Sequence, residues 1–114
     1  RERIIAAIDQ WIADWESLDT AAYLAHYADD FEGRGMNRDQ WSAYKNRVNS
    51  SKKFIDVEIS DLTILGYPAE SDMVIATFSQ RYTSDNFKTT SAKQLYLQKD
   101  PAGQWRIRHE GLPD

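Results

Sequence analysis

Cysteine is absent from this sequence of 114 residues. Its absence excludes disulfide bonds, thiol nucleophiles and thiolate metal sites. Long hydrophobic runs are also missing, so no segment predicts a membrane span and none is typical of a signal peptide. Basic side chains number 14 against 18 acidic ones, which gives a net charge of -4. This balance argues against binding to nucleic acid, because a nucleic-acid-binding domain normally carries a strongly basic patch.

Aromatic residues, by contrast, are plentiful. The sequence has 4 Trp, 6 Tyr and 4 Phe, enough for a substantial core or an aromatic-lined cavity. Its length fits a single domain. The first residue is Arg1 rather than Met, as in a processed protein or an excised domain. We therefore expect residues 1–114 to form one domain, and the first residue alone does not choose between these two origins.

The first half of the sequence predicts helices. A stripe of apolar residues recurs at spacings of three and four, which predicts an amphipathic helix over roughly residues 2–18. The stripe consists of Ile4, Ile8, Trp11, Trp15 and Leu18. Asp19 or Thr20 is suited to cap a second, shorter helix. The apolar face of this second helix consists of Tyr23, Leu24 and Tyr27.

A third helix is predicted from about Arg38. Asn37 precedes Gln40 by three residues, which matches a capping box. The face of this helix that we expect to pack consists of Trp41, Tyr44 and Val48. Phe31 and Glu32, which precede the third helix, are expected to form a short strand.

From Lys52 onward the hydrophobic period changes to two, which indicates strands. The alternation slips by one residue near Ser60–Asp61, and a β-bulge there explains the slip. Further strands are expected at Met73–Thr83, Phe87–Lys99 and Trp105–Glu110. The segments expected to connect them are a loop at Pro68–Asp72 and turns at Asp85-Asn86 and Asp100-Pro101-Ala102-Gly103.

Three helices followed by a meander of strands indicate the α+β class. We expect a cone: a curved antiparallel sheet of four long strands, with one possible short strand, wrapped around the three N-terminal helices. The bulge would supply the curvature, and the open end of the cone would leave a pocket.

The segment Asp19-Thr20-Ala21-Ala22-Tyr23-Leu24-Ala25-His26-Tyr27-Ala28-Asp29-Asp30-Phe31 resembles the nuclear transport factor 2-like (NTF2-like) superfamily, which includes the SnoaL-like enzymes and ketosteroid isomerase. The resemblance extends over nearly the whole chain. It implies the cone fold, but it implies no single activity, because the fold hosts many unrelated functions.

Three segments resemble a narrower group, the accessory domain that follows the catalytic domain of some bacterial L,D-transpeptidases. They are Tyr23–Phe31, Trp41–Asn49 and Ile59–Leu65. The resemblance implies a role in peptidoglycan remodelling and a location in the periplasm or cell envelope. Because those enzymes use a catalytic cysteine in a separate domain, their chemistry cannot reside in this chain. The resemblance therefore implies that residues 1–114 are a single domain excised from a longer protein, which the Arg1 start fits.

The isomerase pattern does not carry over to this sequence. Aligned on Ala28-Asp29-Asp30, the family's tyrosine falls on Trp11 and its aspartate base falls on Gly35. Neither side chain can perform those roles, so we predict no catalytic residue.

His26 and His109 lack partners at ligand spacing, so we also predict no metal site and no cofactor.

Neutral polar side chains on the later strands are the best candidates for ligand binding. They suit hydrogen bonding and stacking with a sugar or peptide if one hairpin register gathers them on one surface. The predicted ligand-binding residues are Tyr44, Gln80, Tyr82, Gln94, Tyr96 and His109. The alternative is that this face is the outer, half-solvated side of the sheet or a dimer contact.

The region around the third helix is locally basic. It contains Arg34, Arg38, Lys45, Arg47, Lys52 and Lys53. These residues form either a solvated face or a surface that attracts the carboxylates of a peptidoglycan stem peptide.

We therefore expect a non-catalytic accessory or ligand-binding module of a cell-wall L,D-transpeptidase. Its expected partner is a small molecule or cell-wall fragment in the cone. The alternatives are a small isomerase, dehydratase or cyclase, and a dimerisation module that forms a homodimer through its sheet.

Overall fold

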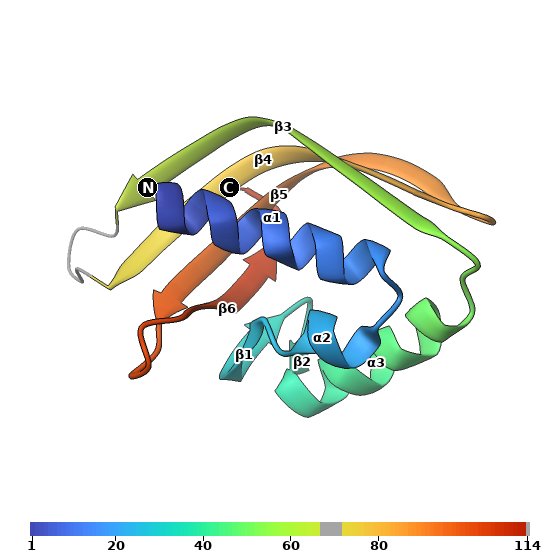
Figure 1. Ribbon diagram of the computed structural model, residues 1–114, viewed down its shortest axis with the longest axis horizontal. Helices are drawn as coiled ribbons and strands as arrows, with labels where there is room; N and C mark the ends of the chain where they lie inside the picture. The colour runs from blue at the N-terminus through green and yellow to red at the C-terminus, as the bar shows by residue number, and fades with distance from the viewer. Residues whose placement is uncertain (67–71, 114) are drawn as a thin grey trace.

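Helices packed inside a curved sheet define the architecture (Figure 1). The computed structural model describes residues 1–66 and 72–113. The helices are α1 (Glu2–Glu16), α2 (Thr20–Leu24) and α3 (Arg38–Ser50). The strands are β1 (Tyr27–Gly33), β2 (Met36–Asn37), β3 (Ile55–Gly66), β4 (Met73–Ser84), β5 (Lys88–Lys99) and β6 (Trp105–Gly111). The expected α+β fold with a curved sheet around N-terminal helices is confirmed.

The sheet has six strands in the order β2-β1-β6-β5-β4-β3. Strands β3 to β6 form the expected antiparallel meander. The expected short strand around Phe31 and Glu32 corresponds to β1, which runs parallel to β6 and thereby makes the sheet mixed. A parallel neighbour joins strands that are far apart in the sequence, so the turn signals along the chain did not indicate it.

Local sequence signals explain the helices. The apolar stripe buries Ile4, Ile8, Trp11 and Trp15 of α1. The Asp19 side chain accepts a hydrogen bond from the backbone of Ala22 and caps α2. The predicted capping box at the start of α3 is present, with reciprocal bonds between Asn37 and Gln40.

Tyr27 corrects the predicted second helix. The helix ends at Leu24, and Tyr27 begins β1 opposite Ile107 of β6. Its ring packs edge-on against Phe31 at 5.0 Å and lies 5.7 Å from the ring of Trp41. These tertiary contacts draw the tyrosine into a strand longer than the short one expected around Phe31 and Glu32.

The predicted bulge in β3 is present. Pairing with β4 shifts register between Ser60 and Thr63, and Asp61 has a φ of 57°. In Figure 1, β3, β4 and β5 arch over α1, while α2 and α3 lie below it. Residues 67–71, which include most of the loop expected at Pro68–Asp72, lie outside the described residues. The curvature leaves the sheet open beside the C-terminal ends of α1 and α3.

Candidate functional site

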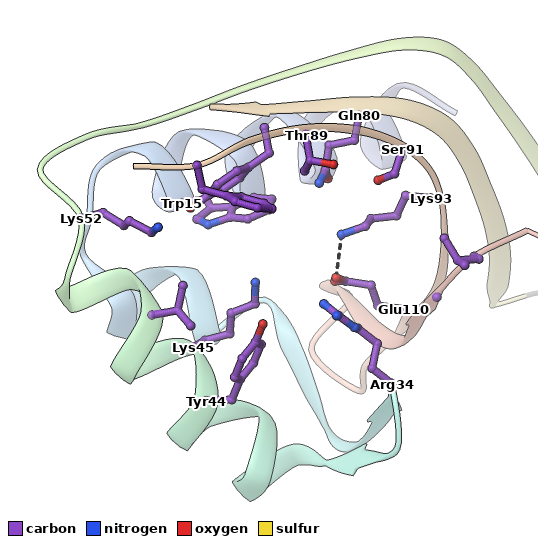
Figure 2. A pocket seen from close by; sticks show the side chains of 15 residues that line it. Trp15, Arg34, Tyr44, Lys45, Lys52, Gln80, Thr89, Ser91, Lys93 and Glu110 are labelled. Carbon is purple, nitrogen blue, oxygen red and sulfur yellow. Dashed lines mark hydrogen bonds and ion pairs between the residues drawn. The ribbon is translucent and has the colours of Figure 1, made fainter. Parts of the chain in front are cut away.

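A pocket of about 630 Å³ occupies this open end. Trp15 at the end of α1, the second half of α3, the adjoining ends of β4 and β5, and the end of β6 line it (Figure 2). The neutral side chains that line it include Trp15, Tyr44, Val48, Gln80, Tyr82, Phe87, Thr89, Ser91 and Leu112. The pocket therefore combines an apolar wall with hydroxyl and amide groups, a composition typical of small-molecule sites.

Positive charge is concentrated in this pocket. Its charged lining residues are Arg34, Lys45, Lys52, Lys93 and Glu110. Four cations thus face one carboxylate, although the chain as a whole carries a net charge of -4. A concave site lined with charge of one sign attracts ligands of the opposite sign, and this one favours anions.

Glu110 is the only carboxylate of the described lining, and 1% of its surface is exposed. Lys93 Nζ lies 2.9 Å from Glu110 Oε2, and the Tyr27 hydroxyl donates to Oε1 at 2.9 Å. Burial acts to raise the pKa of Glu110, but the charges of Lys93 and Lys45 and these hydrogen bonds lower it below its usual value. Glu110 is consequently held as a carboxylate.

A chain of hydrogen bonds continues from Glu110 into the core. Because the single proton of the Tyr27 hydroxyl is donated to Glu110, Tyr23, at 2.8 Å, must donate to Tyr27. Trp11 Nε1 also donates to the Tyr27 oxygen, at 3.2 Å. Burial, together with the charge of Glu110, raises the pKa of both tyrosines well above their usual value. The chain is a fully paired buried network that positions the Glu110 carboxylate at the pocket.

Lys45 reaches the pocket from the buried face of α3. Its ammonium lies 5.0 Å from the ring centres of Trp15 and Trp41, and 5.5 Å from that of Tyr44. The pKa of Lys45 is lowered to about 8. Burial is the main cause, the charge of Glu110 acts against it, and the charges of Lys93 and Arg34 add to it. The rings exclude water from the ammonium, and this burial is what lowers its pKa, while the attraction between the cation and the ring faces acts against that effect.

Two lining residues have buried polar atoms that lack a partner within the described residues. These atoms are the Oε1 atom of Gln80, whose surface is 4% exposed, and the Nε1 atom of Trp15. Buried polar groups are normally hydrogen-bonded. The side chains of the pocket wall thus include one acceptor and one donor that are covered and have no partner among the described residues.

Three of the six predicted ligand-binding residues line this pocket: Tyr44, Gln80 and Tyr82. The expected gathering of Gln80 and Tyr82 with Gln94 and Tyr96 is wrong. In the hairpin of β4 and β5, Gln80 pairs with Ser91, whereas Gln94 pairs with Thr77. Paired residues share a face, so Gln94 and Tyr96 lie on the outer side of the sheet.

His109 also lies outside the pocket. Between Tyr96 and Leu97 the register of β5 with β6 shifts, and Arg108 is the extra residue of the resulting bulge. The bulge places His109 opposite Tyr96 on the outer face, where the two rings meet edge-on at 5.4 Å. It also turns Glu110 inward. Whether any of the six residues contacts a ligand stays a prediction.

Trp15, Lys93 and Glu110 were not among the predicted site residues. Of the pocket cations, Arg34, Lys45 and Lys52 belong to the basic region of the sequence, which is equally consistent with a solvated face and with an anion-binding surface. One signal was present for Lys45, which follows the buried Trp41 by four residues and so shares its side of α3. Nothing local indicated that Lys93 and Glu110 meet.

The two positions that the isomerase pattern would use do not lie at the pocket. Trp11 is buried and donates to Tyr27, while Gly35 borders a separate hollow beside β2.

His26 lies 2.7 Å from Asp14. Among residues 1–66 and 72–113 there is no group of three or more histidine, aspartate or glutamate residues able to hold a metal ion. No described helix combines the length and apolar character needed to cross a membrane.

A curved sheet around N-terminal helices, with a polar pocket at its open end, defines the class of NTF2-like domains. Within that class, residues 3–111 match the family described as the Cds6 C-terminal NTF2-like domain, and the chain belongs to this family. No curated protein matches it in sequence.

Solved structures share the fold closely. Bd1075 of Bdellovibrio bacteriovorus has 25% identity and a TM-score of 0.84, with 96% of this chain and 38% of that chain covered. The helical cell shape determining protein Pgp2 of Campylobacter jejuni (K307A mutant) has 27% identity and a TM-score of 0.86, with 94% and 38% covered. An NTF2-like protein of Pseudomonas putida has 18% identity and a TM-score of 0.81, with 96% and 82% covered. The chain thus spans about two fifths of the first two proteins.

Proposed function

We propose that this domain is a non-catalytic accessory module of a bacterial peptidoglycan-remodelling L,D-transpeptidase, and that its pocket binds a carboxylate-bearing fragment of the cell wall. The observation that carries the proposal is the charge of the pocket. Of its four described cations, only Lys93 is paired with the pocket carboxylate, which leaves Arg34, Lys45 and Lys52 to attract an anion.

The polar wall suits the remainder of a peptide-like ligand. An amide N–H can donate to the unpaired Oε1 of Gln80, and a carboxylate or carbonyl oxygen can accept from Nε1 of Trp15. A ligand group that satisfies such buried atoms gains affinity, because those atoms have no other partner there. Stem peptides of peptidoglycan supply both amides and carboxylates.

The structural neighbours support a location in the cell envelope. Pgp2 is described as a helical cell shape determining protein, and its matching segment is about two fifths of its chain. By analogy, we assign this domain to the periplasm or cell envelope, beside a catalytic domain that carries the cysteine this chain lacks.

An acid–base enzyme is the weaker alternative. A small isomerase or dehydratase needs a carboxylate or histidine whose pKa lies near neutrality. The pKa of Glu110 is instead lowered, by Lys93 and Lys45 acting against burial. A carboxylate that is ionised and already paired is a weak base and cannot serve as an acid near pH 7.

Titration of the isotope-labelled domain with a purified muropeptide tests the proposal. We expect amide shifts at Lys45, Gln80 and Ser91, and much weaker binding of the same muropeptide with its carboxylates amidated. Lys52→Ala should weaken binding by about tenfold, the cost of one charged contact. Lys53→Ala removes the same charge outside the pocket and is the matched control. The absence of shifts with any muropeptide would overturn the proposal.

A further inference from the structure

Lys45 differs from the other lysines at the pocket. Lys93 pairs with Glu110, and Lys52 donates to the side chain of Asn86. Within the described residues, the Nζ atom of Lys45 has neither a hydrogen-bond acceptor nor a carboxylate at ion-pair distance; it has only aromatic rings around it. Figure 2 shows this amine directed into the space between Trp15 and Glu110. It is therefore buried, unpaired and open to the cavity.

This environment favours the neutral amine. Burial lowers the pKa of Lys45 to about 8, and the nearby cations Lys93 and Arg34 act in the same direction, against Glu110. At pH 7 roughly one-tenth of such an amine is unprotonated, against roughly 0.03% of an ordinary lysine. An amine in an apolar cage beside other cations is one of the recognised ways in which a lysine becomes a nucleophile.

The pocket also offers a place for an anionic group next to that amine. Arg34 lines the same cavity and makes no ion pair within the described part of the chain. A guanidinium can bind a carboxylate with two parallel hydrogen bonds. Because Arg34 and Lys45 line the same cavity, a small molecule with a carbonyl beside a carboxylate is suited to contact both side chains.

We propose that Lys45 is a nucleophile that captures a carboxylate-bearing carbonyl compound, of the α-keto acid class, as a covalent imine. The neutral Nζ attacks the carbonyl carbon, and the carbonyl π electrons move to the oxygen. A proton passes from nitrogen to that oxygen through solvent and gives a carbinolamine. The hydroxyl group then leaves as water, so that one amine and one carbonyl yield one imine and one water. No oxidant or reductant takes part.

Reductive trapping tests this proposal directly. The folded domain is incubated at pH 7 with pyruvate and cyanoborohydride, which reduces an imine to a stable amine, and the modified lysine is located by peptide mass mapping. We expect Lys45 to be modified on the order of tenfold faster than the exposed Lys53 or Lys88. Its modification rate should reach half its maximum near pH 8, whereas the rates at the exposed lysines should still rise at pH 10. Acetone, which lacks the carboxylate, should react much more slowly at Lys45.

The proposal is overturned if Lys53 and Lys88 are modified and Lys45 is not. This comparison is made on the unsubstituted domain and needs no variant. Lys45→Arg keeps the positive charge but cannot form the imine. It should abolish trapping at this position, while muropeptide binding is measured separately on the unsubstituted domain. Failure of trapping therefore leaves the proposed accessory function standing, and failure of muropeptide binding leaves the trapping result standing.

Discussion

The hydroxyl of Tyr27 donates a hydrogen bond of 2.9 Å to Oε1 of Glu110, a residue 83 positions further along the chain. The contact joins the first residue of β1 to the end of β6 across a parallel strand pair. It fixes one carboxylate oxygen, while Lys93 fixes the other. The acidic group of the pocket is thus positioned by the two strands on either side of β6, namely β1 and β5.

Replacement of the central hydroxyl should weaken the fold. Tyr27→Phe leaves Glu110 Oε1, Trp11 Nε1 and the Tyr23 hydroxyl without their shared partner. We expect the free energy of unfolding, measured by urea denaturation, to fall by about 1–3 kcal/mol. Tyr23→Phe is the matched control, because it removes only the terminal donor of the chain and should cost about 1 kcal/mol. Equal losses in the two variants would contradict the network.

Loss of the pocket carboxylate should cost more than loss of a surface carboxylate. Glu110→Gln removes the buried carboxylate that pairs with the part-buried ammonium of Lys93, so we expect a loss of about 3–5 kcal/mol in the free energy of unfolding. Glu58→Gln is the control, because Glu58 pairs with Arg81 where both side chains are more than half exposed. It should cost less than about 1 kcal/mol. Denaturant curves of both variants give the comparison.

The same carboxylate predicts the acid limb of the stability profile. The pKa of folded Glu110 is lowered, through Lys93 and Lys45 acting against burial. Its contribution is therefore complete above the unfolded value of 4.5 and is lost as the pH falls through the folded value. Glu110→Gln should flatten this limb in urea denaturation curves recorded from pH 5 downward. An unchanged limb would show that Glu110 is not held ionised.

Lys45 predicts a rise in stability at alkaline pH. Its folded pKa of about 8 lies below the ordinary 10.5, because burial disfavours the cation. Between these values the unfolded chain binds a proton that the folded chain lacks, so stability increases with pH, by about 2 kcal/mol. Above pH 10 the raised pKa values of Tyr23 and Tyr27 reverse the slope. Lys45→Met should remove the rise, as measured by urea denaturation at pH 7–10.

Close packing of β1 against β6 predicts a sensitive glycine. A Cβ atom at Gly33 would lie 2.7 Å from the backbone oxygen of Glu110 and 2.8 Å from the ring of Phe31. Gly33→Ala should therefore lower the free energy of unfolding by about 1–3 kcal/mol. Gly66→Ala is the matched control, because a Cβ there meets no atom of residues 1–66 or 72–113 within 4 Å and the φ of Gly66 is not positive. That variant should be neutral or slightly stabilising.

Much of the fold was predictable because its signals are local. The apolar stripe from Ile4 to Trp15 repeats with the helical period. The capping box of Asn37 and Gln40 involves only neighbouring residues, so it does not depend on where the helix packs in the fold. The slip near Asp61 appears within one strand, so it indicates its bulge without reference to a partner.

The sequence by itself determined the class of fold, the helices and the meander, since each follows from periodicity or turn chemistry within a short window. Only the tertiary structure decided the site. The pairing of Gln80 with Ser91 rather than Gln94, and the bulge at Arg108, set which side chains face the pocket. A shift of one residue exchanges the two faces of a strand, and such a shift depends on the partner strand rather than on the strand's own sequence.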